Sequence, residues 1–217
     1  MTLCVVVPVK WLRDAKSRLS RALSGEARES LVLYMLERVL EAARKCRVVE
    51  DVVVVSPDDR VLRAAHGKGA RCLRDEGKGL NRAVELALNW CVERGYDKAL
   101  VVLSDTPLIT PADIEAMDSA ARAPPTVVIA PSRDCGTNCM LLYPPCAIKP
   151  SYGTGSFLRH IKQARALGVR VEVYLSRNTM FDVDSPEDLA LLLRILGVGA
   201  CSRGIEEVLR RLFSRSL

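Results

Sequence analysis

The chain has 217 residues, of which 49% are hydrophobic and 27% charged, and its formal net charge is +6. This length suits one full-sized domain, and no apolar run approaches the ~18 residues that a membrane span needs. The opening MTLCVVVPVK has no charged leader and is typical of a first strand, so we expect a cytoplasmic protein.

The positive charge is concentrated near the N-terminus. Residues 1–48 contain ten Lys or Arg against five acids, which favours a phosphorylated partner. The ten aromatic residues are not interleaved with a basic stripe, so a small polyanion fits this chain better than nucleic acid.

The first half of the chain alternates candidate strands with candidate helices. Strands are predicted where β-branched runs end in turn residues, and helices where apolar residues recur at helical spacing. Gly67 and Gly95 mark helix ends. In chain order we expect a strand at 3–9, a helix around 31–43, a strand at 49–56, a helix at 58–69, a strand at 70–73 and a helix at 79–95.

The second half continues the alternation. Thr110-Pro111 is typical of a helix start, and Ser185 of a helix N-cap. The last predicted helix is amphipathic with a basic outer face, which is compatible with a homodimer. The expected elements are strands at 98–104, 126–132, 138–145 and 169–175, and helices from 111, at 156–167, at 187–196 and at 203–215.

This alternation predicts an α/β fold: a mainly parallel mixed sheet covered by helices on both sides, in three layers, as a single domain over residues 1–217. Ligands of such sheets bind outside the carboxyl ends of the strands. Asp105 follows the apolar run 99–103 at one such end. A carboxylate there is costly unless a metal, a cation or a ligand compensates its charge.

A second acidic pair lies in FDVDSPEDL, just before the helix predicted at 187–196. Alternation along an extended segment places Asp182 and Asp184 on the same side. Two such carboxylates repel unless a cation lies between them, and oxygen-only ligation suits Mg²⁺ or Mn²⁺. The alternative is that Asp184 or Ser185 only caps the helix.

Two polar loops are candidate anion sites. Residues 130–138 read APSRDCGTN after a predicted strand, and 151–157 read SYGTGSF before a predicted helix. Gly153 and Gly155 permit close backbone approach, and Ser156 lies at a helix N-terminus. Ordinary turns are the alternative for both segments.

Three cations follow the first strand. Lys10, Lys16 and Arg18 could neutralise a nucleotide polyphosphate, although a solvated surface is the alternative. The chain has no G-x-S-x-G elbow and no Walker loop. His66 and His160 have no evident nucleophile partner, and we expect His160 to pack or hydrogen-bond. Chemistry by metals and positioning, such as nucleotidyl transfer, fits this pattern.

Eight cysteines and two histidines complete the inventory. Without a C-x-x-C pair, a structural zinc site is weakly supported. Cys4 and Cys91 lie in apolar patterns typical of small core residues. Whether two of Cys135, Cys139 and Cys146 form a disulfide is not determined by the sequence.

In this order, VPVK…AKSRLS, GLNRAVELA, LSDTPLIT, APSRD-GTN, YGTGSF and DVDSPEDL resemble the 2-phospho-L-lactate guanylyltransferases over residues 4 to about 195. The resemblance implies a GT-A-like nucleotidyltransferase that transfers GMP from GTP to 2-phospho-L-lactate. The products would be lactyl-2-diphospho-5′-guanosine and pyrophosphate, in biosynthesis of the deazaflavin coenzyme. Phosphoenolpyruvate and 3-phospho-D-glycerate stay open as acceptors, and the choice of guanine depends on the resemblance alone.

The resemblance also implies roles for individual residues. It makes Asp105, Lys16 and Arg18 catalytic, and it has Asp105, Asp182 and Asp184 hold Mg²⁺ or Mn²⁺. The implied nucleotide-binding residues are Pro8, Val9, Lys10, Gly79, Leu80 and Asn81, and the implied acceptor-binding residues are Thr137, Asn138, Gly153 and Ser156.

One position departs from the family pattern. Where the family usually has a glycine, this chain has Cys135, which would strain the turn if that glycine needed a positive φ. Two rival functions are considered. One is another enzyme of the same fold class, such as a molybdenum-cofactor guanylyltransferase or a sugar-nucleotide pyrophosphorylase. Those enzymes usually carry a glycine-rich loop after the first strand, where this chain has Pro8-Val9-Lys10-Trp11. A non-catalytic nucleotide- or nucleic-acid-binding module is disfavoured by the three retained acids.

Overall fold

A computed structural model describes residues 1–197 of the chain. They build one seven-stranded sheet with the strand order β3-β2-β1-β4-β6-β5-β7. The strands are β1 (Leu3–Pro8), β2 (Val49–Ser56), β3 (Arg71–Arg74), β4 (Lys98–Val102), β5 (Thr126–Pro131), β6 (Thr137–Tyr143) and β7 (Arg170–Val173). All neighbouring pairs are parallel except those of β6, which runs antiparallel to β4 and β5. The expected mainly parallel mixed sheet is confirmed.

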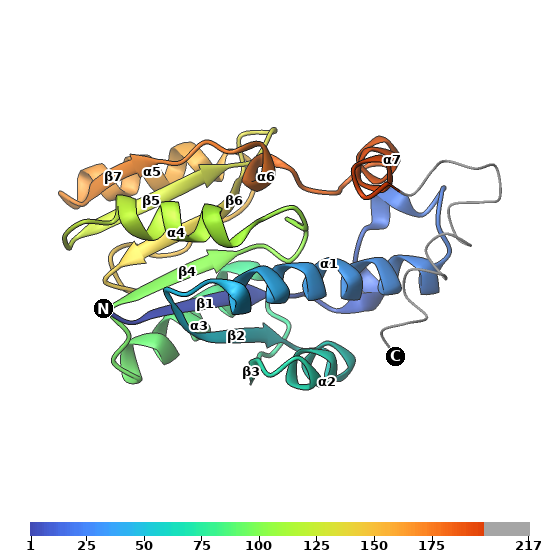
Figure 1. Ribbon diagram of the computed structural model, residues 1–217, viewed down its shortest axis with the longest axis horizontal. Coiled ribbons are helices and arrows are strands. Elements are labelled where there is room, and N and C mark those ends of the chain that lie inside the picture. Colours follow the sequence, from blue (N-terminus) through green and yellow to red (C-terminus); the bar gives the residue numbers. More distant parts are fainter. Residues whose placement is uncertain (198–217) are drawn as a thin grey trace.

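Helices cover both faces of the sheet (Figure 1). The α-helices are α1 (Gly25–Lys45), α2 (Asp59–Gly67), α3 (Leu80–Glu93), α4 (Pro111–Ala120), α5 (Ser156–Ala166), α6 (Arg177–Met180) and α7 (Pro186–Ile195). One core cluster joins α1, α2, α4 and α7 to one face, and a second joins α3 and α5 to the other. The three-layer expectation is confirmed.

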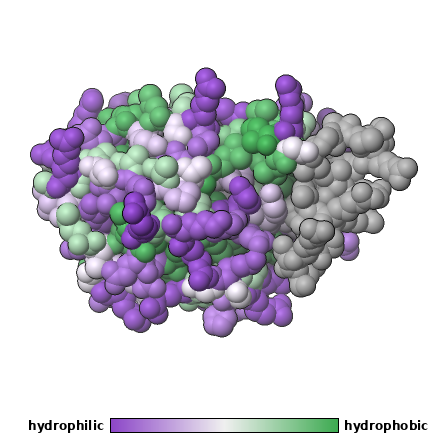
Figure 2. All heavy atoms as spheres, in the orientation of Figure 1, coloured by the Kyte–Doolittle hydropathy of each residue, from purple (hydrophilic) through white to green (hydrophobic). Residues whose placement is uncertain are grey.

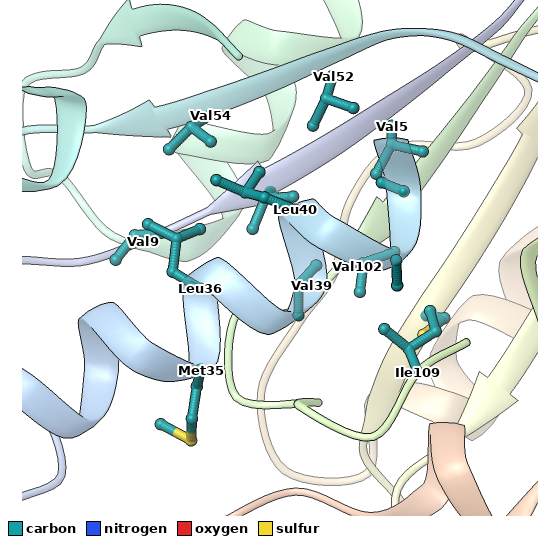
Figure 3. Packing of buried hydrophobic residues seen from close by; sticks show 14 of the residues in the cluster. Val5, Val9, Met35, Leu36, Val39, Leu40, Val52, Val54, Val102 and Ile109 are labelled. Atoms are coloured by element: carbon teal, nitrogen blue, oxygen red, sulfur yellow. The ribbon is translucent and has the colours of Figure 1, made fainter. Parts of the chain in front are cut away.

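The central strands are buried on both faces because each face has its own helical layer. All six residues of β1 are buried, which explains why it reads as a continuous apolar run. Alternate residues divide between the clusters: Val5 joins the α1 side and Val6 the α3 side. Figure 3 shows Leu36, Val39 and Leu40 of α1 among sheet valines.

Helix ends follow the predicted signals. Thr110 and Ser185 are the N-caps of α4 and α7, each followed by proline and closed by a capping box. The short 3-10 turns η1 (Leu12–Asp14) and η2 (Ser17–Leu19), and α6, were not predicted. The helix expected at 203–215 and the homodimer that it suggested concern residues outside the described part.

The surface is mixed in character. The face in Figure 2 is mostly hydrophilic, with smaller hydrophobic areas between the polar side chains. No helix among residues 1–197 combines the length and hydrophobicity that crossing a membrane requires.

Candidate active site

A cavity of about 530 Å³ opens at the carboxyl ends of β1 to β4. Its walls come from the segments that follow these strands, from α1, from the first turns of α3 and from the segment before α7. The sheet order brings the strand ends together although they are far apart in sequence. The volume lies in the usual range of small-molecule sites, ~300–1,000 Å³, and the position is the one expected for an α/β sheet.

The segment after β1 is shaped by two buried leucines. Leu12 and Leu19 anchor η1 and η2, and the Leu12 amide donates to the Asp58 carboxylate at 3.1 Å. Between the two turns, Lys16 adopts a left-handed conformation with φ 51°. In Figure 1 this segment lies beside α7, which brings Lys16 to acids from distant parts of the chain.

Lys16 bridges two of the predicted acids. Its Nζ donates to Asp105 Oδ2 at 2.8 Å and to Asp184 Oδ1 at 2.9 Å, and only 8% of its side chain is exposed. Burial acts to lower the pKa of the Lys16 ammonium, but the two carboxylates outweigh it and hold that pKa above its usual value. Arg18 lies 3.6 Å from Asp184 and is largely exposed. We call Lys16, Asp105 and Asp184 the Lys16 cluster.

Asp182 lies next to this cluster. Burial, with the negative charges of Asp105 and Asp184, raises the pKa of Asp182 to about 6. Arg133 donates to the Asp182 carbonyl at 2.8 Å and lies 3.9 Å from its carboxylate. The structure thus gathers three carboxylates around one buried ammonium, while Arg18 and Arg133 are more exposed.

The cap alternative is resolved by geometry. The Ser185 hydroxyl accepts from the Asp188 amide and is the N-cap of α7. The Asp184 carboxylate instead bonds Lys16. The Asp105 carbonyl accepts from the Val183 amide at 3.3 Å, and this bond ties the two acidic segments together.

The acids around Lys16 only partly fit the predicted divalent metal. Within residues 1–197, no three His, Cys, Asp or Glu side chains form a group that could hold a metal ion. Two features still fit a cation: Asp105 Oδ1 is buried without a hydrogen-bond partner, and carboxylate oxygens are the ligands that Mg²⁺ prefers. The metal therefore stays a prediction.

The expected nucleotide-binding residues divide into two groups. Pro8, Val9 and Lys10 line the cavity, as do Gly79 and Leu80 at the start of α3. Asn81 does not.

The amide of Asn81 is instead used within the protein. Its Nδ2 donates to the Tyr152 carbonyl at 3.2 Å, and its Oδ1 accepts from the Tyr152 amide at 2.6 Å. This pair of bonds fastens the glycine-rich loop 151–155 to α3.

None of the four expected acceptor-binding residues lines the cavity, and two of them, Thr137 and Ser156, belong to a buried network with His160. Thr137 Oγ1 accepts from Ser156 Oγ at 3.2 Å and lies 3.1 Å from His160 Nδ1. His160 Nε2 accepts from the Ser151 amide at 2.9 Å. Burial and the nearby Arg159 charge lower the pKa of His160 to about 4. The neutral ring therefore carries its proton on Nδ1 and donates it to Thr137.

The other two expected acceptor-binding residues, Asn138 and Gly153, have separate structural surroundings. Asn138 is buried, and its Nδ2 donates to the Thr179 carbonyl at 3.0 Å. Gly153 has φ 127° in the turn before α5, a conformation that favours glycine. The structure thus brings Thr137 and Ser156 together, whereas Asn138 bonds the backbone of α6 and the Asp182 carboxylate.

Nearly the whole chain matches one protein family. The family model described as guanylyl transferase CofC like covers residues 3–213. The chain belongs to this family. A relative from Rubrobacter xylanophilus named phosphoenolpyruvate guanylyltransferase is 47% identical over 88% of this chain and 94% of the relative. One named 2-phospho-L-lactate guanylyltransferase, from Methanothermobacter thermautotrophicus, is 39% identical over 98% and 92%.

Solved structures support the same fold. A structure from Desulfovibrio desulfuricans G20, described as a nucleotide-diphospho-sugar transferase, superposes with a TM-score of 0.74 at 17% identity, covering 100% of this chain and 97% of that one. A CMP:2-keto-3-deoxy-manno-octonic acid synthetase complexed with CTP gives 0.64 at 14% identity, covering 91% and 99%. The chain is thus a nucleotidyltransferase by both fold and family. The expected fold and enzyme class are confirmed.

The departure from the family's glycine is visible in the backbone. Cys135 has φ 63°, so the expected strain is confirmed. The neighbouring Gly136 is required for space, because a Cβ there would lie 2.6 Å from Ser132 Oγ. Cys135, Cys139 and Cys146 are free thiols, and Cys4 and Cys91 are buried core residues as expected.

Several residues near the site were not foreseen. Arg133 joins Asp182 to Asp188, and Trp11 and Asp75 line the cavity. Arg133 gave no signal of its own, because an arginine in a polar turn is normally solvated. Asp75 could have been found from its place directly after a predicted strand, by the reasoning that identified Asp105.

Proposed function

We propose that this enzyme transfers GMP from GTP to 2-phospho-L-lactate, forming lactyl-2-diphospho-5′-guanosine and pyrophosphate in deazaflavin coenzyme biosynthesis. The observation that carries the proposal is the Lys16 cluster, which places a buried ammonium among excess carboxylates on a nucleotide-sized cavity. Membership of the guanylyl transferase family supports the reaction class. The cytoplasm, where GTP is available, is the proposed location.

The chemistry follows from charge. A phosphate oxygen of the acceptor attacks the α-phosphorus of GTP in line, and the bond to the β-phosphate oxygen breaks to release pyrophosphate. The acceptor phosphate has a second pKa near ~6 and is mostly dianionic at neutral pH, so it needs no general base. The main barrier is the approach of two polyanions. Lys10, Lys16 and Arg18 lower it by placing positive charge along the cavity.

Asp105, Asp182 and Asp184 are the residues that would hold Mg²⁺ or Mn²⁺. Bound there, the ion would neutralise phosphate charge and act as a Lewis acid. Two observations support this assignment. Asp105 Oδ1 is buried without a hydrogen-bond partner, and the pKa of Asp182 is raised although Arg133 lies 3.9 Å from its carboxylate.

Thr137, Asn138, Gly153 and Ser156 are proposed to bind the acceptor. Thr137 accepts two hydrogen bonds, from Ser156 and His160. Its lone pairs are therefore occupied, and its own proton is left to donate to an anion. A hydroxyl held in this way suits a carboxylate or phosphate oxygen.

A second acceptor is favoured by the relatives. Those that are 47% and 43% identical, from Rubrobacter xylanophilus and Sphaerobacter thermophilus, are both named phosphoenolpyruvate guanylyltransferase. Phosphoenolpyruvate and 2-phospho-L-lactate share the carboxylate and the phosphate on the adjacent carbon, so one site can present the same donors to either.

The decisive experiment measures pyrophosphate release with Mg²⁺, pairing GTP, ATP and CTP with 2-phospho-L-lactate, phosphoenolpyruvate and 3-phospho-D-glycerate. Release only with GTP and 2-phospho-L-lactate is the expected result. Release with GTP and another acid would keep the mechanism and change the acceptor. No release from any pair, by folded protein, would favour the non-catalytic nucleotide-binding module.

A further inference from the structure

The cavity has a second end, remote from the Lys16 cluster. There Asp75 follows β3 and lines the cavity beside Pro57, Gly77 and Leu80. Asp75 Oδ1 accepts from the Gly77 amide at 3.2 Å, and the Asp75 amide donates to the Ser56 carbonyl at 3.3 Å. These bonds hold the carboxylate in place at the mouth of β3.

Asp75 differs from the other acids of the cavity wall. Asp14 lies 3.9 Å from Arg13, and Asp105 and Asp184 both bond Lys16. Within the described part of the chain, Asp75 has no ion-pair partner. An unpaired carboxylate would repel a polyphosphate, so its free lone pairs suit a part of the ligand that carries N–H donors.

The sheet order separates this end from the phosphate end. Asp75 follows β3 and Asp105 follows β4, with β2 and β1 between them. Three strand spacings amount to ~14 Å, comparable with the span of a nucleotide from its base to its phosphates. With the phosphates at the Lys16 cluster, the base reaches Asp75.

The surroundings of Asp75 suit a flat heterocycle. Leu80 begins α3, lines the cavity and is 38% exposed, so its apolar surface faces the space that a ligand would fill. Pro57 adds further apolar wall. Gly77 has φ 69°, and a Cβ there would lie 2.7 Å from Trp11 Nε1, so the indole packs directly against this turn.

We propose that Asp75 determines the choice of guanine by accepting hydrogen bonds from N1–H and the 2-amino group of the base. These are two adjacent donors that a carboxylate pairs with both oxygens. Adenine and cytosine instead present a ring lone pair beside their amino group, and this lone pair would face the carboxylate. The inference rests on the proposed function and supplies a reason within this chain for the nucleotide that it uses.

The test compares wild type with Asp75→Asn in steady-state pyrophosphate release, using GTP, ITP, XTP and ATP with the acceptor that wild type uses best. Asparagine keeps an oxygen for the Gly77 amide and replaces the other oxygen with an NH₂ group. That group repels the 2-amino group of guanine but donates to the 2-oxo group of xanthine. Glu76→Gln is the matched control, because Glu76 is the next residue, is exposed and pairs with Lys78.

Wild type should use GTP ~10-fold or more better than ITP, which lacks the 2-amino group. In Asp75→Asn, kcat/KM for GTP should fall ~10- to 100-fold, mainly through KM. The XTP-to-GTP ratio should rise at least ~10-fold. Glu76→Gln should keep the wild-type ranking.

Three results would overturn the inference while leaving the proposed function intact. Wild type could use GTP while Asp75→Asn keeps the same ranking of bases. The kcat/KM of the variant could fall equally for all four nucleotides, which would make Asp75 a structural residue of the turn. Its kcat/KM could also rise equally for all four nucleotides. That result would mean that the Asp75 carboxylate lies beside the phosphates and repels them. Wild type inactive with every nucleotide would instead contradict the proposed function itself.

Discussion

Two buried lysine–carboxylate pairs lie near opposite ends of β4 and have different surroundings. At the N-terminal end, Lys98 Nζ donates to Asp118 Oδ1 at 2.8 Å and to the Asp118 carbonyl at 3.2 Å, and lies 5.1 Å from the Tyr143 ring centre. At the C-terminal end, Lys16 bonds Asp105 at the same 2.8 Å but shares its charge with Asp184.

The difference is in the charge balance. Lys98 is 3% exposed and has one carboxylate, so that pair is closed and neutral. The Lys16 cluster borders a cavity, has Asp182 beside it and leaves Asp105 Oδ1 without a donor. The Lys98–Asp118 pair stabilises the fold, whereas the Lys16 cluster has carboxylate oxygens that can still bind a cation. These additional carboxylate oxygens, rather than the ion pair itself, distinguish the candidate active site.

The largest expected effect separates the two pairs by activity. Asp105→Asn should lower kcat by about 10³-fold or more, because it removes a carboxylate from the reacting end of the cavity. Asp118→Asn weakens the other pair by the same chemical change and should leave kcat within about twofold of wild type. Steady-state pyrophosphate release measures both. Equal losses in the two variants would show that the pairs have the same, structural role.

The second prediction separates the pairs by stability. Lys98→Met removes the ion-pair partner of the Asp118 carboxylate, which is 22% exposed, and should cost about 2–3 kcal/mol of unfolding free energy. Lys16→Met should cost only about 1 kcal/mol, because Asp184 is 41% exposed and water from the cavity can solvate the released charges. Urea denaturation at pH 7 measures the two losses. A larger loss for Lys16→Met would mean that the Lys16 cluster is primarily a structural element.

His160 sharpens the comparison because it is a buried titratable group that stays neutral. Its pKa is lowered from 6.5 to about 4 in the folded protein, so the unfolded chain binds more protons between these values. Its contribution to stability is complete above pH 6.5 and is lost as the pH falls to 4. Wild type should lose about 2–3 kcal/mol more than His160→Asn over this range.

The measurement is the difference in urea-unfolding free energy between wild type and variant at pH 7, 5.5 and 4. His66→Asn is the control, because it makes the same side-chain change at an exposed position. A parallel profile for wild type and His160→Asn would contradict the neutral, hydrogen-bonded histidine.

The smallest effect concerns the backbone. Lys16 and Cys135 are the two non-glycine residues with positive φ in the described chain, and only Lys16 has ion pairs that hold it there. Cys135→Gly should therefore raise stability by about 0.5–1 kcal/mol, since relief of strain exceeds the added freedom of the unfolded chain. Thermal unfolding should shift upward by roughly 1–4 °C. A lower melting temperature would show that the Cys135 side chain makes a stabilising contact.

The sequence by itself determined the strands, the longer helices of the described part and the position of the acids, but not η1, η2 or α6. Apolar runs and capping residues such as Thr110 and Ser185 act within a few residues, so their consequences can be predicted from a short window of sequence. Placing Asp105 at a strand end required no tertiary information. The resemblance then named the family, which the comparisons confirmed.

The tertiary structure alone decided which side chains meet. Lys16 bonds acids that are 89 and 168 residues away, and Asn81 bonds a loop 71 residues away instead of lining the cavity. β6 enters the sheet antiparallel between β4 and β5, which brings Asn138 beside the end of β4. Local patterns specify what each segment becomes. Contacts across the molecule depend on strand order and burial, which are properties of the whole chain packed together.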